Sequence, residues 1–164
     1  MSSRSALIQR DGDVVDLDGA SPVSLVADPA AYHVVLRHRN HLGVMTWANN
    51  ALGPLLVGID LTDGNTATYG SEAQVTVGGV KLLWAGDVTF DGSVKYTGEA
   101  NDRDPILFAI GGVVPTNTLD DAYTNEDVNM DGRVMYTGEG NDRDIILQNI
   151  GGVIPTTVRE GQTP

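Results

Sequence analysis

Hydrophobic positions in the first eighty residues occur in short runs separated by turn residues, and no stretch keeps the spacing of an amphipathic helix. An Asp11-Gly12 pair lies between two of these runs, and this dipeptide is a strong signal for a β-hairpin. Six or seven short strands at this spacing predict an antiparallel β-sandwich. The expected strands cover residues 6–10, 13–17, 23–26, 32–39, 43–47, 55–61 and 73–77.

From Lys81 onward the pattern changes to two acidic loops, each followed by a short helix. In the first helix Asn101 is a suitable cap, Pro105 fits an early helical position, and Gly111-Gly112 ends the element. We therefore predict two domains, residues 1–80 and 81–164. The apolar stripes that should pack on each other or on the sandwich are Ile106, Leu107 and Ile110 in one helix and Ile146, Leu147 and Ile150 in the other.

The two loop-and-helix segments are copies of one unit. They cover residues 87–116 and 127–156, and 21 of the 30 aligned positions are identical. Identity at this level over a fixed offset indicates a tandem duplication. Any chemistry carried by one copy is therefore expected in the other.

The recurring pattern is a spacing of oxygen ligands that is typical of calcium loops. Oxygen-bearing side chains occupy loop positions one, three and five, and a glycine at position six permits the sharp turn. The usual carboxylate at position twelve is missing, because Gly98 and Gly138 fall there. If the Tyr-Thr-Gly-Glu segment is an insertion, Asp102 and Asp142 close the cages, with Asp104 and Asp144 as rival closing ligands.

These positions define two predicted calcium sites, each holding one Ca²⁺ ion. Three carboxylates in a flexible, all-oxygen cage favour calcium over magnesium. Thr89 is a poorer donor than Asn129, so site one should be the weaker site. Site one comprises Asp87, Thr89, Asp91, the carbonyl of Ser93, and Asp102; site two comprises Asp127, Asn129, Asp131, the carbonyl of Arg133, and Asp142.

Composition narrows the classes of partner. The formal net charge of −12 argues against nucleic acid and against an anionic membrane surface, since both would be repelled. The chain has no cysteine, no apolar run long enough to span a membrane, and no apolar core of a signal peptide at its N-terminus. No arrangement of nucleophile and base is recognisable, so we do not expect an enzyme.

The repeats resemble the type I dockerin fold, whose calcium loops read D-x-N-x-D-G-x-V, as residues 127–134 do here. Over nearly the whole chain, phrases such as RHRNHLGVMT (residues 37–46), RDGDVVD (10–16) and YTGEGNDRD (136–144) are similar to C-terminal modules of secreted Bacteroidota surface proteins, many exported by type IX secretion. That family usually has further strands before the point where this chain begins. The resemblance implies an extracellular location and an immunoglobulin-like sandwich that lacks strands.

We therefore expect a mainly β protein with short helices: a sandwich followed by a dockerin-like pair of calcium units. Its expected role is structural or adhesive at a bacterial surface, without catalysis. An open sheet edge would allow homo-oligomers or filaments to form by strand donation. Two other roles stay open: anchoring to a cohesin-like receptor, as dockerins do, and binding of glycans as an accessory domain of a secreted enzyme.

Three further groups of side chains have a functional and a structural interpretation. His38 and His41 could bind zinc, but a strand followed by a turn explains them better, because no cysteine or clear third ligand accompanies them. A third calcium site is conceivable at Asp11, Asp13, Asp16 and Asp18, which also fit hairpin turns and a polar strand face. Trp47 and Trp84 could stack on sugars but are more often core residues.

Overall fold

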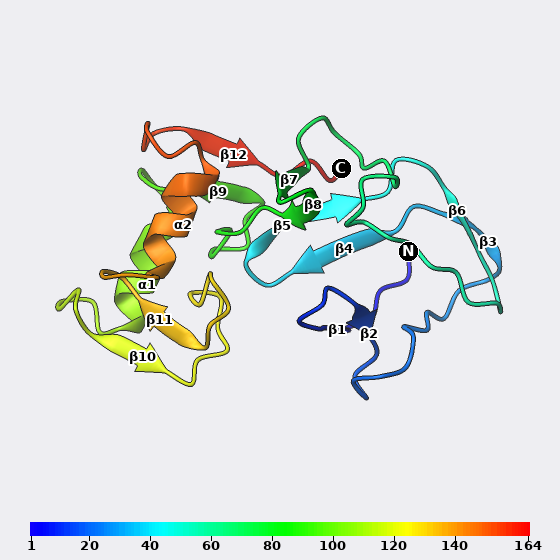
Figure 1. Ribbon diagram of the computed structural model, residues 1–164, viewed down its shortest axis with the longest axis horizontal. Coiled ribbons are helices and arrows are strands. Elements are labelled where there is room, and N and C mark those ends of the chain that lie inside the picture. Colours follow the sequence, from blue (N-terminus) through cyan, green and yellow to red (C-terminus); the bar gives the residue numbers. More distant parts are fainter.

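The computed structural model describes residues 1–164 and shows a mainly β protein with two short helices (Figure 1). All strand pairing is antiparallel, and it forms six two-stranded sheets. The two helices and the strands of the repeats lie at one end of the elongated molecule, and the β3–β6 pair lies at the other. Neither helix has the length and apolar character needed to cross a membrane.

Four of the six sheets lie in the N-terminal part of the chain. The predicted hairpin is confirmed around Asp11-Gly12, where Leu7 pairs opposite Val15. A second hairpin, which was not predicted from the sequence, turns at Gly78-Gly79 with both glycines at positive φ. Such φ values suit glycine because it has no Cβ. The pairs are β1 (Leu7–Ile8) with β2 (Val14–Val15), β3 (Ala30–Tyr32) with β6 (Asn50–Leu52), β4 (Val35–His38) with β5 (His41–Met45), and β7 (Gln74–Val77) with β8 (Val80–Leu83).

Two predicted strands, at residues 23–26 and 55–61, do not form. They have no partner strand, and most of their apolar side chains stay in solvent, with Val26 93% and Leu55 82% exposed. A strand needs a neighbour to satisfy its backbone groups, and the local sequence does not provide one. The N-terminal sheets stay two-stranded, so the coarse prediction of antiparallel β-structure is confirmed and the complete sandwich is not.

The C-terminal part contains the two helices in the predicted positions. Helix α1 covers Arg103–Ala109 and α2 covers Asp142–Asn149. The side chains of Asn101 and Asn141 each accept a hydrogen bond from a backbone N–H three residues later, at 3.0 Å in both copies. This is the expected N-terminal capping, because it satisfies an N–H group that has no partner within the helix.

The strands of the two repeats are exchanged. β9 (Ser93–Lys95) lies in the first loop and pairs with β12 (Val158–Glu160), which follows the second helix. Likewise β11 (Arg133–Met135) in the second loop pairs with β10 (Thr118–Asp120), which follows the first helix. Each repeat therefore completes the loop of the other, an arrangement that the sequence did not predict.

The same exchange appears in side-chain hydrogen bonds and in the core. The Thr97 hydroxyl donates to the Pro155 carbonyl, and the equivalent Thr137 donates to Pro115, both at 2.9 Å. The buried core takes four equivalent residues from each repeat and adds Leu42 from β5, so packing crosses the predicted boundary near residue 80. The eight repeat residues are Val88, Val94, Ile106 and Ile110, and Val128, Val134, Ile146 and Ile150.

Candidate metal centre

In the first loop two buried carboxylates, Asp87 and Asp102, organise the backbone. Asp87 is 3% exposed, and its two oxygens accept the N–H groups of Asp91 at 3.0 Å and Gly92 at 3.1 Å. Asp102 is fully buried and accepts from the N–H of Thr89 at 3.0 Å and the N–H of Lys95 at 2.8 Å. The loop is thus wrapped around two anionic side chains.

The second loop repeats this arrangement with equivalent residues. Asp127 accepts from the N–H groups of Asp131 at 3.1 Å and Gly132 at 3.3 Å. Asp142 is fully buried and accepts from three backbone N–H groups, those of Val128, Asn129 and Met135, at 2.7, 3.2 and 2.8 Å. The duplication therefore preserves the hydrogen bonds of the loop as well as its sequence.

The positions of Asp102 and Asp142 agree with treating Tyr-Thr-Gly-Glu as an insertion, because both side chains lie inside their loops. The rival ligands Asp104 and Asp144 lie elsewhere. Each accepts from the capping asparagine at 2.9 Å and from the preceding arginine at 3.0 Å, in the first turn of its helix. Their side chains are about half exposed, 49% and 47%.

The side chains at loop positions three and five, Thr89 and Asp91 in loop one, are more exposed than the two buried carboxylates. In loop one the Asp91 carboxylate accepts the Ser93 N–H at 2.9 Å and forms an ion pair with Lys95 at 3.1 Å. The Thr89 hydroxyl donates to Asp102 at 3.0 Å, and the Ser93 hydroxyl donates to Glu160 at 2.9 Å. These side chains lie beside the two buried carboxylates, but their polar atoms bond to protein groups.

In loop two the corresponding side chains form a different set of bonds. The Asn129 side chain accepts the Asp131 N–H at 2.8 Å and donates to Asp131 and to the Gly140 carbonyl at 3.1 and 2.8 Å. The Arg133 N–H donates to Asp131 at 2.9 Å, while its guanidinium pairs with Asp120. The guanidinium of Arg133 has no acceptor atom, so the carbonyl stays the only group of Arg133 that could bind a cation.

Burial and like charge perturb the carboxylates of both loops. Burial raises the pKa of Asp87 to about 6; the N–H of Gly92 opposes this shift and the charge of Asp102 adds to it. Burial also raises the pKa of Asp102, Asp127 and Asp142. Desolvation and a neighbouring anion disfavour the charged form, and a nearby cation would reverse that effect.

The structure brings together part of each predicted ligand set. No group of three or more His, Cys, Asp or Glu side chains is arranged to hold a metal ion. The donor chemistry nevertheless fits calcium: each Asp87 oxygen accepts one N–H, and a carboxylate oxygen has two lone-pair positions. The available ligands are hard oxygens, which suit calcium.

Side chains of the β4–β5 turn reach the second loop only, a contact that sequence reasoning missed. The fully buried Asn40 donates to the carbonyls of Asn125 and Asp127 at 2.9 and 2.7 Å. Arg39 lies 3.5 Å from the Asp127 carboxylate and stacks over the Tyr123 ring at 4.2 Å. These contacts join residues more than eighty positions apart, and no motif in the neighbouring sequence predicts them.

The other candidate groups have structural surroundings. His38 and His41 lie with their Nδ1 atoms 2.9 Å apart, and His41 also contacts the Asn40 side-chain oxygen at 2.7 Å, without a third His, Cys, Asp or Glu. Trp84 packs under the Arg159 guanidinium at 3.5 Å, whereas Trp47 is exposed and stacks on Tyr69.

The N-terminal aspartates do not assemble a third site. The Asp11 carboxylate accepts the N–H of Asp13, Asp16 pairs with Arg4, and Asp18 accepts from Ser21. The hydrogen bonds from Ser21 and Ala20 lower the pKa of Asp18 to about 2. These are hairpin and turn contacts, in agreement with the structural interpretation.

Comparison of the chain with protein-family models, with curated proteins and with solved structures finds no match.

Proposed function

We propose that the two repeats bind one calcium ion each and that calcium holds the C-terminal half in its folded form. The observation that carries this proposal is the pair of buried carboxylates in each loop, Asp87 with Asp102 and Asp127 with Asp142, at equivalent places in a duplicated unit. A buried pair of like charges is costly, and a divalent cation between them offsets both the desolvation and the repulsion.

The ligands at site one are Asp87, Thr89, Asp91, the Ser93 carbonyl and Asp102; at site two they are Asp127, Asn129, Asp131, the Arg133 carbonyl and Asp142. The buried pair is already held in each loop by backbone N–H groups. The more exposed ligands at the middle of each loop give up their protein partners when the ion binds; Asp91, for example, exchanges its ion pair with Lys95 for a bond to calcium. When bound, calcium supplies positive charge and a common point of attachment for the loop.

The energetic consequence is large for a protein of this size. An ion present at one hundred times its dissociation constant adds about 2.7 kcal/mol per site, or about 5 kcal/mol for two sites. The whole stability of a small domain is about 5–15 kcal/mol. We therefore propose that calcium stabilises the folded protein and takes no part in a catalytic reaction.

We further propose that the protein is a non-catalytic structural or adhesive module of the bacterial cell surface. The resemblance of the repeats to dockerins and of the chain to secreted Bacteroidota modules supports this location. The net charge of −12 is compatible with calcium as a partner and unfavourable for nucleic acid. A protein that depends on millimolar extracellular calcium would be folded outside the cell and loosened where calcium is scarce.

Self-assembly by strand complementation is the form of adhesion that the N-terminal region favours. Its sheets contain two strands each, so they keep open edges. The apolar Leu55 and Leu56 lie outside any strand and are 82% and 78% exposed. Unpaired strand edges beside exposed apolar segments favour addition of a strand from another copy, which would complete an immunoglobulin-like sandwich.

Isothermal titration calorimetry with calcium and thermal unfolding with and without chelator test this function. We expect two binding events and a lower melting temperature in chelator; absence of binding heat at millimolar calcium, together with unchanged melting, would refute the metal proposal. Light scattering over a range of protein concentrations tests the assembly. A chain that stays monomeric at the highest soluble concentration refutes strand complementation and leaves calcium binding intact.

A further inference from the structure

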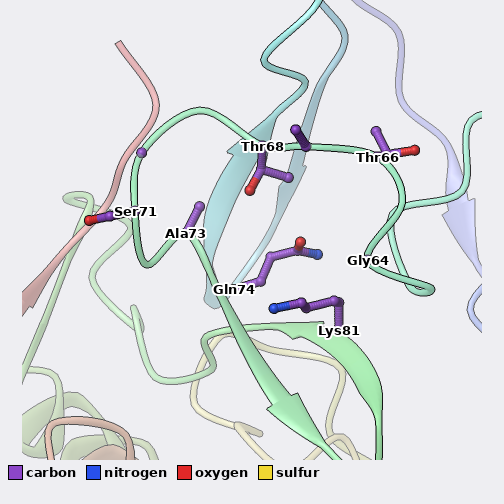
Figure 2. Close-up of a pocket in the computed structure, with 9 residues that line it drawn as sticks. Gly64, Thr66, Thr68, Ser71, Ala73, Gln74 and Lys81 are labelled. Atoms are coloured by element: carbon purple, nitrogen blue, oxygen red, sulfur yellow. The ribbon is translucent and has the colours of Figure 1, made fainter.

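A polar cavity of about 220 Å³ lies in the N-terminal region, between the segment 64–71 and the β7–β8 hairpin (Figure 2). Gln74 comes from β7 and Lys81 from β8, and Thr68 comes from the segment that faces them. Figure 2 shows the Thr68 hydroxyl pointing toward the space beside Gln74, whereas the Ser71 hydroxyl points away from it. None of the predicted calcium ligands lines this cavity.

Backbone hydrogen bonds hold the walls of this cavity in place. Segment 64–71 is fixed to β5 and its continuation, because the Trp47 N–H donates to the Ala67 carbonyl and the Tyr69 N–H to the Met45 carbonyl, both at 2.8 Å. The opposite wall is fixed by the Lys81 N–H, which donates to the Thr62 carbonyl at 2.7 Å. A cavity with fixed walls needs little ordering when a ligand enters.

Lys81 is a cation without a partner. Seven of the ten Lys and Arg residues form ion pairs in the structure, and Lys81 is not among them. It is the charged residue of the cavity lining. The nearby Asp60 and Asp63 accept hydrogen bonds from Thr62 and Asn65 in their own turns.

The neutral groups beside Lys81 add one acceptor and one hydroxyl. The Gln74 side chain donates through Nε2 to the Leu61 carbonyl at 2.9 Å, and this bond leaves its Oε1 as an acceptor. The Thr68 hydroxyl can donate or accept. A ligand that combines an anionic group with hydroxyls would satisfy all three side chains.

We propose that this cavity binds a small hydroxylated carboxylate, of the size and chemistry of one acidic sugar residue. The carboxylate bonds to the Lys81 ammonium, and a ligand hydroxyl donates to Gln74 Oε1. The volume of about 220 Å³ is below the range of about 300–1,000 Å³ that is typical of sites for drug-sized ligands, which limits the occupant to one such residue. This binding site does not depend on calcium.

The test is an NMR titration of the full-length protein, labelled with ¹⁵N, with glucuronate as probe and glucose as its neutral counterpart. Glucuronate should shift the backbone amides of residues 66–74 and 81 in a saturable way, and glucose should not. Methyl glucuronide, blocked at the anomeric oxygen, mimics the terminal residue of a glycan. Binding as tight as that of free glucuronate would indicate that the site accepts a glycan end, and weaker binding would indicate a free acid as the ligand.

Two charge-matched variants isolate the role of Lys81. Lys81→Gln should weaken glucuronate binding about tenfold or more, because a charge-assisted hydrogen bond is lost. Arg10→Gln removes the same charge from an exposed turn and should leave binding unchanged. If Lys81→Gln does not fold, Thr68→Val serves in its place and should weaken binding severalfold. Equal weakening in Lys81→Gln and Arg10→Gln, or no saturable shifts at the cavity, overturns the proposal.

Discussion

The two loops share one backbone arrangement and differ in what surrounds it. In both, a buried first carboxylate and a buried closing carboxylate accept equivalent backbone N–H groups, and the closing Asp142 accepts one more, from Val128. In loop one Lys95 forms an ion pair with Asp91, whereas in loop two Arg39 lies near the first carboxylate, Asp127. The comparison shows that the shared residues form the same loop backbone while the charged neighbours of the two loops differ. If the loops bind calcium as proposed, these neighbouring cations should make the two affinities unequal.

The largest expected effect comes from removing the closing carboxylates. Asp102→Ala and Asp142→Ala should each lower the free energy of unfolding by at least about 3 kcal/mol, since each leaves two or three buried N–H groups without an acceptor. Urea denaturation without calcium measures this loss. Calorimetry should then find one calcium site instead of two.

Glu99→Ala is the control for this pair, because Glu99 is exposed and lies in the Tyr-Thr-Gly-Glu segment of the same loop. It should change the stability by less than about 0.5 kcal/mol. If the two closing-residue variants are as mild as this control, the loops are not organised around Asp102 and Asp142.

The next effect should separate the loops. Asn40→Ala removes a fully buried amide and leaves the carbonyls of Asn125 and Asp127 unpaired, which should cost about 1–3 kcal/mol. Calcium affinity should fall at site two and stay constant at site one. Asn117→Ala is the matched control, since the exposed Asn117 also donates to a carbonyl, that of Ile110; equal changes at both sites would contradict the asymmetry.

His41, next to the turn that contacts loop two, should make the stability of the protein depend on pH. Burial lowers the pKa of His41 to about 3, and the charges of His38 and Arg39 contribute. The unfolded chain, with an ordinary histidine pKa near 6.5, therefore binds the proton first as pH falls, so stability is lost between about pH 6.5 and pH 3, by at most about 1.4 kcal/mol per pH unit.

The measurement compares urea unfolding of the wild-type protein and of His41→Gln at several pH values in this window. Carboxylates titrate in both proteins and cancel in the difference between them. The stability advantage of the wild-type protein should shrink as pH falls. A difference that stays constant with pH would mean that folding does not shift the pKa of His41, which would contradict this prediction.

The smallest effect concerns the third position of each loop. Exchanging the two residues, with Thr89→Asn in loop one and Asn129→Thr in loop two, should raise the calcium affinity of site one and lower that of site two by a few-fold, because the amide oxygen is the better ligand. Calorimetry on the two variants gives both constants. If the affinities do not respond, the neighbouring cations Lys95 and Arg39 decide the difference between the sites.

Local features of this fold were predictable from the sequence. Asp11-Gly12 predicts its hairpin because the turn conformation depends on two adjacent residues, and Asn101 predicts a cap because the accepted N–H lies three residues away. The burial of Asp102 inside its loop follows from the phase of the helix behind it. In each case the determining residues are neighbours in the chain.

Features that depend on distant segments were not predictable. The apolar runs at residues 23–26 and 55–61 have strand composition but no partner, so they stay irregular. Nothing in the residues of β12 indicates that it pairs with β9, more than sixty residues earlier. Likewise the sequence identifies Arg39 only as the end of a predicted strand, whereas in the structure it lies beside Asp127. Such pairings follow from the assembled topology, and the single sequence does not encode them in a local signal.

The exchanged strands have a consequence for a shorter chain. A polypeptide with one loop, one helix and one trailing strand would have a loop strand and a trailing strand that cannot pair as they do here, since each finds its counterpart in the other repeat. Two such polypeptides, related by a twofold axis, would satisfy both. The present protein makes both of these reciprocal pairings within one chain, so cutting the chain between the repeats should yield halves that reassociate rather than halves that fold alone.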